Sequence, residues 1–228
     1  LLIDPAAADE RIEAELDHID HIAVTHHHPD HVGQVAEYAA EANATIWCRY
    51  GRESAFADAT GIEPDRTFRE GTAIPTGDGV VTIHDTPGHA VEHVAFGVGT
   101  DVIVGDVAVA EGSVVVGTPE GDMRAYLTSL RRLWAMAPDR LLPAHGPVID
   151  DPRATCERLI RHRIDRERRV LAAVEAGNQT VRDILGAAYD KDLTGVQDLA
   201  EATVRAHLEK LHHEGQIEWD GSRVESTV

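Results

Sequence analysis

Four of six consecutive positions are histidine in the stretch Thr25-His26-His27-His28-Pro29-Asp30-His31. Only 14 of the 228 residues are histidine, so fewer than one is expected by chance in six positions. In an extended loop alternate side chains point the same way, so His26 and His28 converge on one point while His27 faces away. A polar loop or an affinity tag is the alternative, but a tag would be terminal.

The second half of this stretch predicts the start of a helix. Proline is favoured in the first helical turn, so a helix that begins at Pro29 places Asp30 and His31 at the edge of the sheet where the loop lies. Imidazole and carboxylate groups are ligands of zinc, iron and manganese. The stretch therefore predicts a metal site.

Three further potential ligands follow, each after an apolar strand and beside a glycine: His89, Asp106 and His145. Glycine lets backbone approach closely at such junctions. Taken singly, each is more often a loop residue without a role. Taken in this order after the histidine cluster, the set is specific.

This ligand pattern resembles that of the metallo-β-lactamase superfamily. The resemblance implies an α/β fold, an αββα sandwich with layered α and β elements and a dinuclear metal site at one edge. It implies one ion held by His26, His28 and His89, a second held by Asp30, His31 and His145, and Asp106 bridging both. An Asp at this bridging position, where a Cys would stand, argues against the antibiotic-hydrolysing zinc β-lactamases.

The resemblance also implies the chemistry. A hydroxide that bridges two divalent ions, zinc or else manganese or iron, is the expected nucleophile, and Asp30 and Asp106 are the expected catalytic carboxylates. His93, four residues beyond His89, either supports a ligand from behind or is a structural histidine on the following strand. His18, His21 and His84 are expected to be structural, and His207, His212 and His213 to lie on the surface.

Similarity beyond the ligands points to the β-lactamase-like protein 2 group, whose mitochondrial member is an endoribonuclease acting on single-stranded RNA. It is carried by residues 106–116, 121–123, 144–149, 162–167 and the C-terminal segment. Members of that group carry further strands before the equivalent of Leu1–Asp4. The first residue here is Leu, so a segment upstream is expected to be missing and an edge of the sheet to be exposed.

Two domains are expected. Residues 1–150 alternate short β-rich runs with helical segments, which indicates a layered catalytic domain. Residues 151–228 read as a long helix followed by a small winged-helix-like domain. The expected helices lie at 6–17, from Pro29, at 122–136 and at 153–176, and the expected strands include 19–25, 44–48, 80–85, 94–98, 102–104, 114–116 and 140–142.

Charge and composition restrict the environment. Forty acids against 21 bases give a formal net charge of −19, which repels nucleic acid and anionic lipid. Only two of the bases, Lys191 and Lys210, are lysine, a composition typical of a halophilic protein. No apolar run is long enough to cross a membrane, and Cys48 and Cys156 are expected to be inert thiols in a cytoplasmic protein.

Three functions remain open. The short spacings between His89, Asp106 and His145 leave no room for an inserted domain, which excludes the nucleases built that way. A small thioester or ester, as in hydroxyacylglutathione hydrolases, is the favoured substrate. Residues 153–169 hold seven arginines, and RNA cleavage is the alternative if its phosphates bind Arg161, Arg163, Arg166 and Arg169. A solvated or domain-bridging helix with internal charge pairs is the favoured explanation of those arginines.

The third function is a metal-responsive regulator that binds DNA through the winged helix. Its expected recognition helix carries two basic residues, Arg205 and Lys210, and three glutamates, so its net charge does not attract the phosphates of DNA. A lid or domain-packing role is favoured for this part of the chain. A homodimer stays open.

Overall fold

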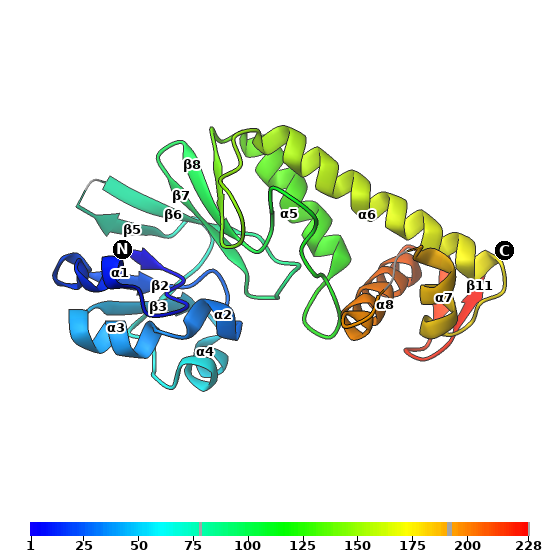
Figure 1. The fold of residues 1–228 in the computed structure, drawn as a ribbon, viewed down its shortest axis with the longest axis horizontal. Helices are drawn as coiled ribbons and strands as arrows, with labels where there is room; N and C mark the ends of the chain where they lie inside the picture. Colours follow the sequence, from blue (N-terminus) through cyan, green and yellow to red (C-terminus); the bar gives the residue numbers. More distant parts are fainter. Residues whose placement is uncertain (78, 191–192, 228) are drawn as a thin grey trace.

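The computed structural model describes residues 1–77, 79–190 and 193–227. Two sheets face each other in it (Figure 1). The first is parallel, in the order β1 (Leu2–Ile3), β2 (His21–Ala23), β3 (Thr45–Arg49) and β4 (Arg66–Phe68). The second runs β5 (Ala73–Thr76), β6 (Gly79–Asp85), β7 (Val94–Val98), β8 (Asp101–Gly105) and β9 (Leu141–Pro143), antiparallel until β9 joins β8 in parallel.

Helices cover the outer face of each sheet. Short helices lie on the first sheet: α1 (Glu10–Glu13), a 3-10 turn (Leu16–His18), α2 (Pro29–Val32), α3 (Val35–Ala42) and α4 (Glu53–Thr60). The second sheet is covered by α5 (Met123–Met136) and by the first half of α6 (Pro152–Glu175) (Figure 1). The described elements therefore form four layers, helices, sheet, sheet and helices, which is the predicted αββα order.

Alternation along the strands explains the layers. Successive side chains of a strand point to opposite faces, so Ile22 packs under the helices while Ala23 packs between the sheets. In the same way, β8 turns Val102 and Val104 toward α5 and α6 and turns Ile103 inward. Three separate apolar clusters therefore hold the sandwich together.

Some local predictions were wrong. The predicted helix at 6–17 is a four-residue helix followed by a 3-10 turn, and residues 114–116 form no strand. Val114 and Val116 are nonetheless buried against the α5 side of the sandwich, because β-branched residues fill a core equally well from an irregular segment. Helix α4 was missed because it buries a single side chain, Phe56, and so has no apolar periodicity.

A second group of elements follows the sandwich. It contains α7 (Val181–Ala188), α8 (Gln197–His213) and a hairpin of β10 (Ile217–Trp219) and β11 (Val224–Ser226) around its own apolar cluster. Helix α6 belongs to both groups, since Leu159 packs with the sandwich and Val170 with the second cluster. The order of elements is the one predicted for a winged helix, and that assignment and the boundary near residue 150 stay predictions.

Two predictions about single side chains can be compared with the structure. Cys48 and Cys156 are buried, and burial raises the pKa of each thiol to about 12, which keeps both in the unreactive protonated form. His207 was predicted at the surface but is fully buried, because α8 packs this face against α6 and its ring nitrogen Nδ1 lies 3.3 Å from a carboxylate oxygen of Glu167. His212 and His213 are exposed as expected.

No helix among the described residues combines the length and the hydrophobicity that a membrane-spanning segment requires.

Candidate metal centre

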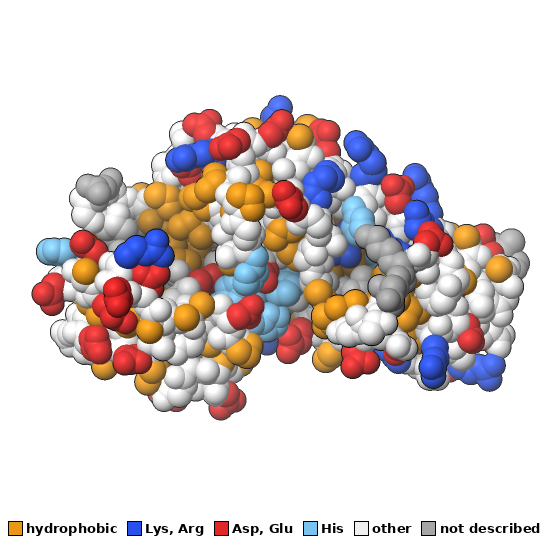
Figure 2. Space-filling view, in the orientation of Figure 1, with side chains coloured by type: hydrophobic (Ala, Val, Ile, Leu, Met, Phe, Trp, Pro, Cys, Tyr) orange, Lys and Arg blue, Asp and Glu red, His pale blue; other side chains and the backbone are white. Residues whose placement is uncertain are grey.

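All seven predicted ligands come together at one edge of the sandwich. The loop after β2 carries His26 and His28, and α2 carries Asp30 and His31. The β6–β7 loop carries His89, Asp106 follows β8 directly, and His145 lies two residues beyond β9. Figure 2 shows histidine side chains gathered in the middle of the face that it displays. Strand ends from both sheets therefore meet at the predicted place.

The first group of candidate ligands consists of three imidazoles. His26 Nε2 and His89 Nε2 each lie 3.0 Å from His28 Nδ1. The ligand atoms of the three residues lie within 4.8 Å of one another. One cation can therefore contact all three rings.

The second group consists of Asp30, His31 and His145, whose ligand atoms also lie within 4.8 Å of one another. His145 Nε2 is 3.3 Å from a carboxylate oxygen of Asp30. Asp106 lies between the two groups, with one carboxylate oxygen 3.6 Å from both His31 Nε2 and His89 Nε2. Its other oxygen is 3.5 Å from His145 Nε2.

Hydrogen bonds on the outer side of the rings set the tautomers of the first group. The hydroxyl of Thr25 donates a hydrogen bond to Asp4, so its oxygen is left to accept one from His26 Nδ1 at 2.9 Å. His89 Nδ1 donates to the carbonyl of Val115 at 2.7 Å. His28 Nε2 lies 2.7 Å from a carboxylate oxygen of Glu120. All three inner nitrogens therefore carry lone pairs that face one another, the arrangement that a cation stabilises.

Burial and neighbouring groups shift the pKa values of the first candidate ligand group. Burial lowers the pKa of His26, and the neighbouring imidazoles lower it further. Burial also lowers the pKa of His89. Neutral imidazole is the form that binds a metal ion, so both rings are held in the competent state.

His31 differs because carboxylates flank it. Burial by itself lowers the pKa of this ring, but the nearby carboxylates of Asp106 and Asp4 outweigh it and raise the pKa to about 10. Burial raises the pKa of Asp106, yet the neighbouring imidazoles, His31 first, leave that pKa below the usual value. The carboxylates that favour the protonated ring would equally favour a cation at this place.

Two buried polar atoms in this group have no hydrogen-bond partner among the described residues: His31 Nε2 and one carboxylate oxygen of Asp106. An unpaired buried polar atom is costly, and a place for an ion is one of its ordinary explanations. The donor set of imidazoles and carboxylates fits divalent zinc, iron or manganese. The residues present therefore fit a metal centre.

His93 lies behind Asp106. Its Nε2 accepts the backbone N–H of Asp106 at 3.0 Å, so the proton is on Nδ1, which lies 2.9 Å from the hydroxyl of Thr86. The ring is buried just before β7, and burial lowers its pKa to about 3. Of the two predicted roles, the geometry is that of a group that positions Asp106.

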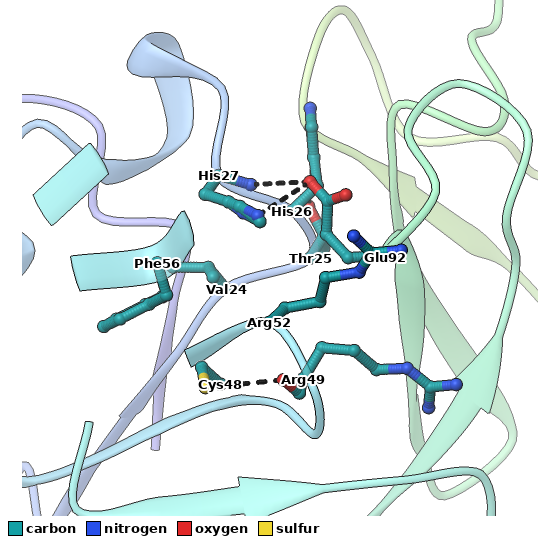
Figure 3. A pocket seen from close by; sticks show the side chains of 9 residues that line it. All are labelled: Val24, Thr25, His26, His27, Cys48, Arg49, Arg52, Phe56 and Glu92. Carbon is teal, nitrogen blue, oxygen red and sulfur yellow. Dashed lines mark hydrogen bonds and ion pairs between the residues drawn. The ribbon is translucent and has the colours of Figure 1, made fainter. Parts of the chain in front are cut away.

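His27 belongs to none of the candidate ligand groups among the described residues. Its Nε2 lies 3.2 Å from a carboxylate oxygen of Glu92, and Figure 3 shows these two side chains turned toward each other. Glu92 is in the loop that carries His89, so this pair ties the two ligand-bearing loops together.

Sequence reasoning missed several residues that support the rings, above all Asp4. This carboxylate contacts His31, and it accepts from both the N–H and the hydroxyl of Thr25. A signal existed, because Asp4 follows an apolar strand in the same way as the predicted ligands do. Glu92 and Glu120 gave no signal, since they lie in irregular segments.

The four arginines predicted for nucleic acid do not form one face. Arg163 is buried, Arg166 lies over the ring of Tyr189, and Arg169 pairs with Asp190. Arg161 is exposed. The four side chains therefore do not share the exposed face of α6, because the inner face of this helix packs on two apolar clusters of the fold.

Two cavities border the metal-binding edge. One of about 540 Å³ has Asp30, His31 and His145 in its wall together with apolar side chains such as Ile103 and Leu142. The other, of about 290 Å³, lies beside His28 and is lined mainly by residues of α4 and of the β6–β7 loop. Both volumes are within or close to the range that small molecules fill.

Comparison with known proteins agrees with this geometry. Residues 2–145 match the family model described as the Metallo-beta-lactamase superfamily. The chain belongs to this superfamily. The predicted resemblance and fold are thereby confirmed, and the chain is a metal-dependent hydrolase of the metallo-beta-lactamase fold.

Individual relatives refine the comparison. The chain is 30% identical over 216 residues to the beta-lactamase-like protein 2 homolog of Drosophila melanogaster, covering 90% of this chain and 73% of that protein. It is 31% identical over 186 residues to the hydroxyacylglutathione hydrolase of Acidiphilium cryptum, covering 78% of this chain and 69% of that protein. A beta-lactamase domain protein from Burkholderia ambifaria has the same fold, with a TM-score of 0.80 at 23% identity over 98% of this chain and 82% of its own.

Proposed function

We propose that this chain holds two divalent metal ions and uses them to hydrolyse a small thioester or ester. The observation that carries the proposal is the convergence of two three-residue ligand groups on either side of Asp106. The similarity to a protein named hydroxyacylglutathione hydrolase supports the substrate class. The cavities beside the centre are of a size for small molecules, not for a polymer.

The residues divide the work between them. His26, His28 and His89 would hold one ion, and Asp30, His31 and His145 the other, with Asp106 in contact with both. Zinc is the ion we expect, with manganese or iron as alternatives, and such ions lower the pKa of water and polarise the carbonyl that is attacked. His93 holds the backbone of Asp106 in place.

Asp30 and His145 are the exposed members of the set. Their side chains are 61% and 52% exposed, whereas those of His31 and Asp106 are buried. Asp30 is thus the carboxylate that solvent and substrate reach first. In this proposal it takes the proton that water loses on attack and passes it to the leaving group.

Neither nucleic-acid hypothesis gains support from the described residues. Three of the four arginines predicted for nucleic acid are buried, stacked or paired: Arg163, Arg166 and Arg169. In α8 the carbonyl of Ala202 accepts a hydrogen bond at 3.4 Å from the N–H of Thr118, in the loop next to the metal centre. This contact favours a domain-packing role for α8 over a recognition helix.

Metal content and turnover test the proposal together. We expect two ions per chain by elemental analysis, and turnover of an acyl-glutathione thioester or an aryl ester. Asp106→Asn should lower kcat/KM by more than the roughly 10–100-fold that loss of a supporting partner costs. Asp139→Asn, at an exposed position, makes the same chemical change and should leave turnover unaltered.

Two results would contradict the proposal. A single bound ion in active protein would remove the dinuclear centre. Cleavage of labelled single-stranded RNA, with every thioester and ester left intact and activity lost in Asp106→Asn, would assign the site to the nuclease alternative.

A further inference from the structure

A cavity of about 250 Å³ lies apart from the predicted ligands, between the segment Ser113–Val115, helix α6 and the start of α8. Arg163 and Arg166 line it, and so does the ring of Tyr189. Among the described residues in its wall none carries a carboxylate, although the chain has 40 acids and a formal net charge of −19. The lining is therefore positive in a strongly negative protein.

Arg163 has the most unusual surroundings of these residues. Its side chain is buried, and one terminal nitrogen donates to the carbonyl of Val114. Its Nε has no hydrogen-bond partner among the described residues, and no carboxylate of the described chain pairs with the guanidinium. A guanidinium stays protonated and offers five donors, so a buried one without a carboxylate is incompletely satisfied.

Arg166 forms the adjoining wall. Its guanidinium lies 3.5 Å from the centre of the Tyr189 ring and donates to the carbonyl of Ala188. These contacts hold the group in place without neutralising its charge. Two fixed guanidinium groups thus line one small cavity, which is the arrangement that proteins use to bind carboxylate and phosphate.

The rim of the cavity is apolar. Val115, Val196 and Leu199 are among its lining residues, and each is more than a third exposed. Val115 also links the cavity to the metal centre, because its carbonyl accepts the hydrogen bond from His89 Nδ1. A ligand in the cavity would contact Val115, which itself contacts the candidate metal ligand His89.

We infer that this cavity binds an organic anion, a carboxylate or phosphate group carried on an apolar chain. The guanidinium groups of Arg163 and Arg166 hold the anionic end, and the rim of Val115, Val196 and Leu199 covers the apolar part. The inference concerns binding and does not depend on the bond that the metal centre hydrolyses.

Calorimetric titration of the full metal-loaded chain with hexyl phosphate, hexanoate and hexanol tests the chemistry of the ligand. We expect at least one of the two anions to bind and hexanol not to bind. The anion that binds more tightly, hexyl phosphate or hexanoate, shows whether the cavity prefers a phosphate or a carboxylate group. Equal binding of hexanol would overturn the inference, because it would show an apolar pocket without anion recognition.

The metal centre also attracts anions, so a change at the rim must locate the binding. Val196 is the N-cap residue of α8, where Asp and Asn are both favoured and neither should disturb the helix. Val196→Asp adds a negative charge beside the cavity and should weaken anion binding roughly tenfold, whereas Val196→Asn should not. Equal affinities in the two variants would place the anion elsewhere.

A second pair of variants tests the arginines. Arg166→Gln removes a charged donor and should weaken binding about tenfold or more. Arg168→Gln makes the same change on the exposed side of α6 and should have no effect. Unchanged binding in Arg166→Gln would overturn the inference, while hydrolysis of a neutral ester in the same variants reports separately on the metal centre.

Discussion

At the level of single residues, Asp4 joins the edge strand β1 to the histidine loop. One of its carboxylate oxygens lies 2.9 Å from His31 Nδ1 and accepts from the hydroxyl of Thr25 at 2.7 Å. The other accepts from the backbone N–H of Thr25 at 2.6 Å. Because Thr25 in turn accepts from His26, this one carboxylate orients a ring of each candidate ligand group.

We therefore expect Asp4→Asn to weaken metal binding by about 10–100-fold, since an amide has one acceptor fewer and no charge. Competition with a chelator of known affinity measures the change. Asp17→Asn, at an exposed position in the 3-10 turn, is the matched control and should bind metal as the parent does. An unaltered affinity in Asp4→Asn would mean that the rings are oriented without this carboxylate.

Among the elements, the β6–β7 loop and helix α5 are in very close contact. Gly88 has a φ of +136°, and a Cβ built on it would lie 2.3 Å from backbone atoms of Tyr126 in α5. The loop can carry His89 to the metal centre only because the residue before it has no side chain. Close approach and backbone conformation both require glycine at this position.

Gly88→Ala should lower the free energy of unfolding by several kcal/mol, because a clash with a helix backbone adds to an unfavourable φ. Gly99→Ala is the comparison, since Gly99 has a φ of +59° but no atom within 4 Å of a built Cβ. It should cost only about 1–2 kcal/mol. Urea unfolding of both variants measures the difference, and similar losses would argue against close packing at α5.

Helices α6 and α8 meet through buried polar groups. Glu167 of α6 accepts from Lys210 at 2.7 Å and lies 3.3 Å from His207 Nδ1. Burial lowers the pKa of His207, and the nearby charges of Arg163 and Lys210 act in the same direction, although Glu167 opposes them. The ring is therefore neutral in the folded chain at neutral pH.

This shift gives a pH dependence of known sign. The folded pKa lies below the unfolded value of about 6.5, so the unfolded chain binds the proton first as pH falls. The stability that depends on neutral His207 is complete above that value and is lost at lower pH. Between pH 7 and 5, His207→Gln should lose about 1 kcal/mol less unfolding free energy than the parent. His213→Gln, at an exposed position, should lose as much unfolding free energy as the parent over this pH range. An equal loss in His207→Gln would contradict the prediction, because it would mean that the ring of His207 is charged in the folded chain.

For the whole molecule, the excess of acids is the dominant feature. A formal net charge of −19 on 228 residues destabilises the compact state through self-repulsion. Salt shortens the range of this repulsion, from about 10 Å at 0.1 M to about 3 Å at 1 M. The halophilic character inferred from composition is a prediction about this balance.

We expect the midpoint of thermal unfolding to rise when KCl is increased from 0.1 to 2 M, because screening removes the repulsion while exposed ion pairs contribute little. A scan of Tm against KCl concentration measures the effect. Sorbitol at matched osmolality is the control for effects unrelated to charge. A flat or falling curve would contradict the halophilic prediction.

Much of the site could be predicted from the sequence because its ligands lie at strand ends. Strand periodicity and glycine punctuation are local signals, so the chain itself places His26, His89, Asp106 and His145 at strand ends. The resemblance to the superfamily implied that these strand ends meet at one edge. The predicted α5 is present, and the predicted α6 was right to within a residue or two, because both have an apolar face or defined caps.

The tertiary structure alone decided which residues surround those ligands. Asp4 meets His31 across 27 positions and His28 meets Glu120 across 92, distances over which no local pattern carries information. The same holds for Arg163 and His207, whose burial depends on how α6 and α8 pack. The sequence by itself therefore determined the candidate ligands, through their spacing at strand ends, and its resemblance to the superfamily implied the layers. Packing between distant elements decided the orientation of the rings, the burial of charged groups and the cavity beside α6.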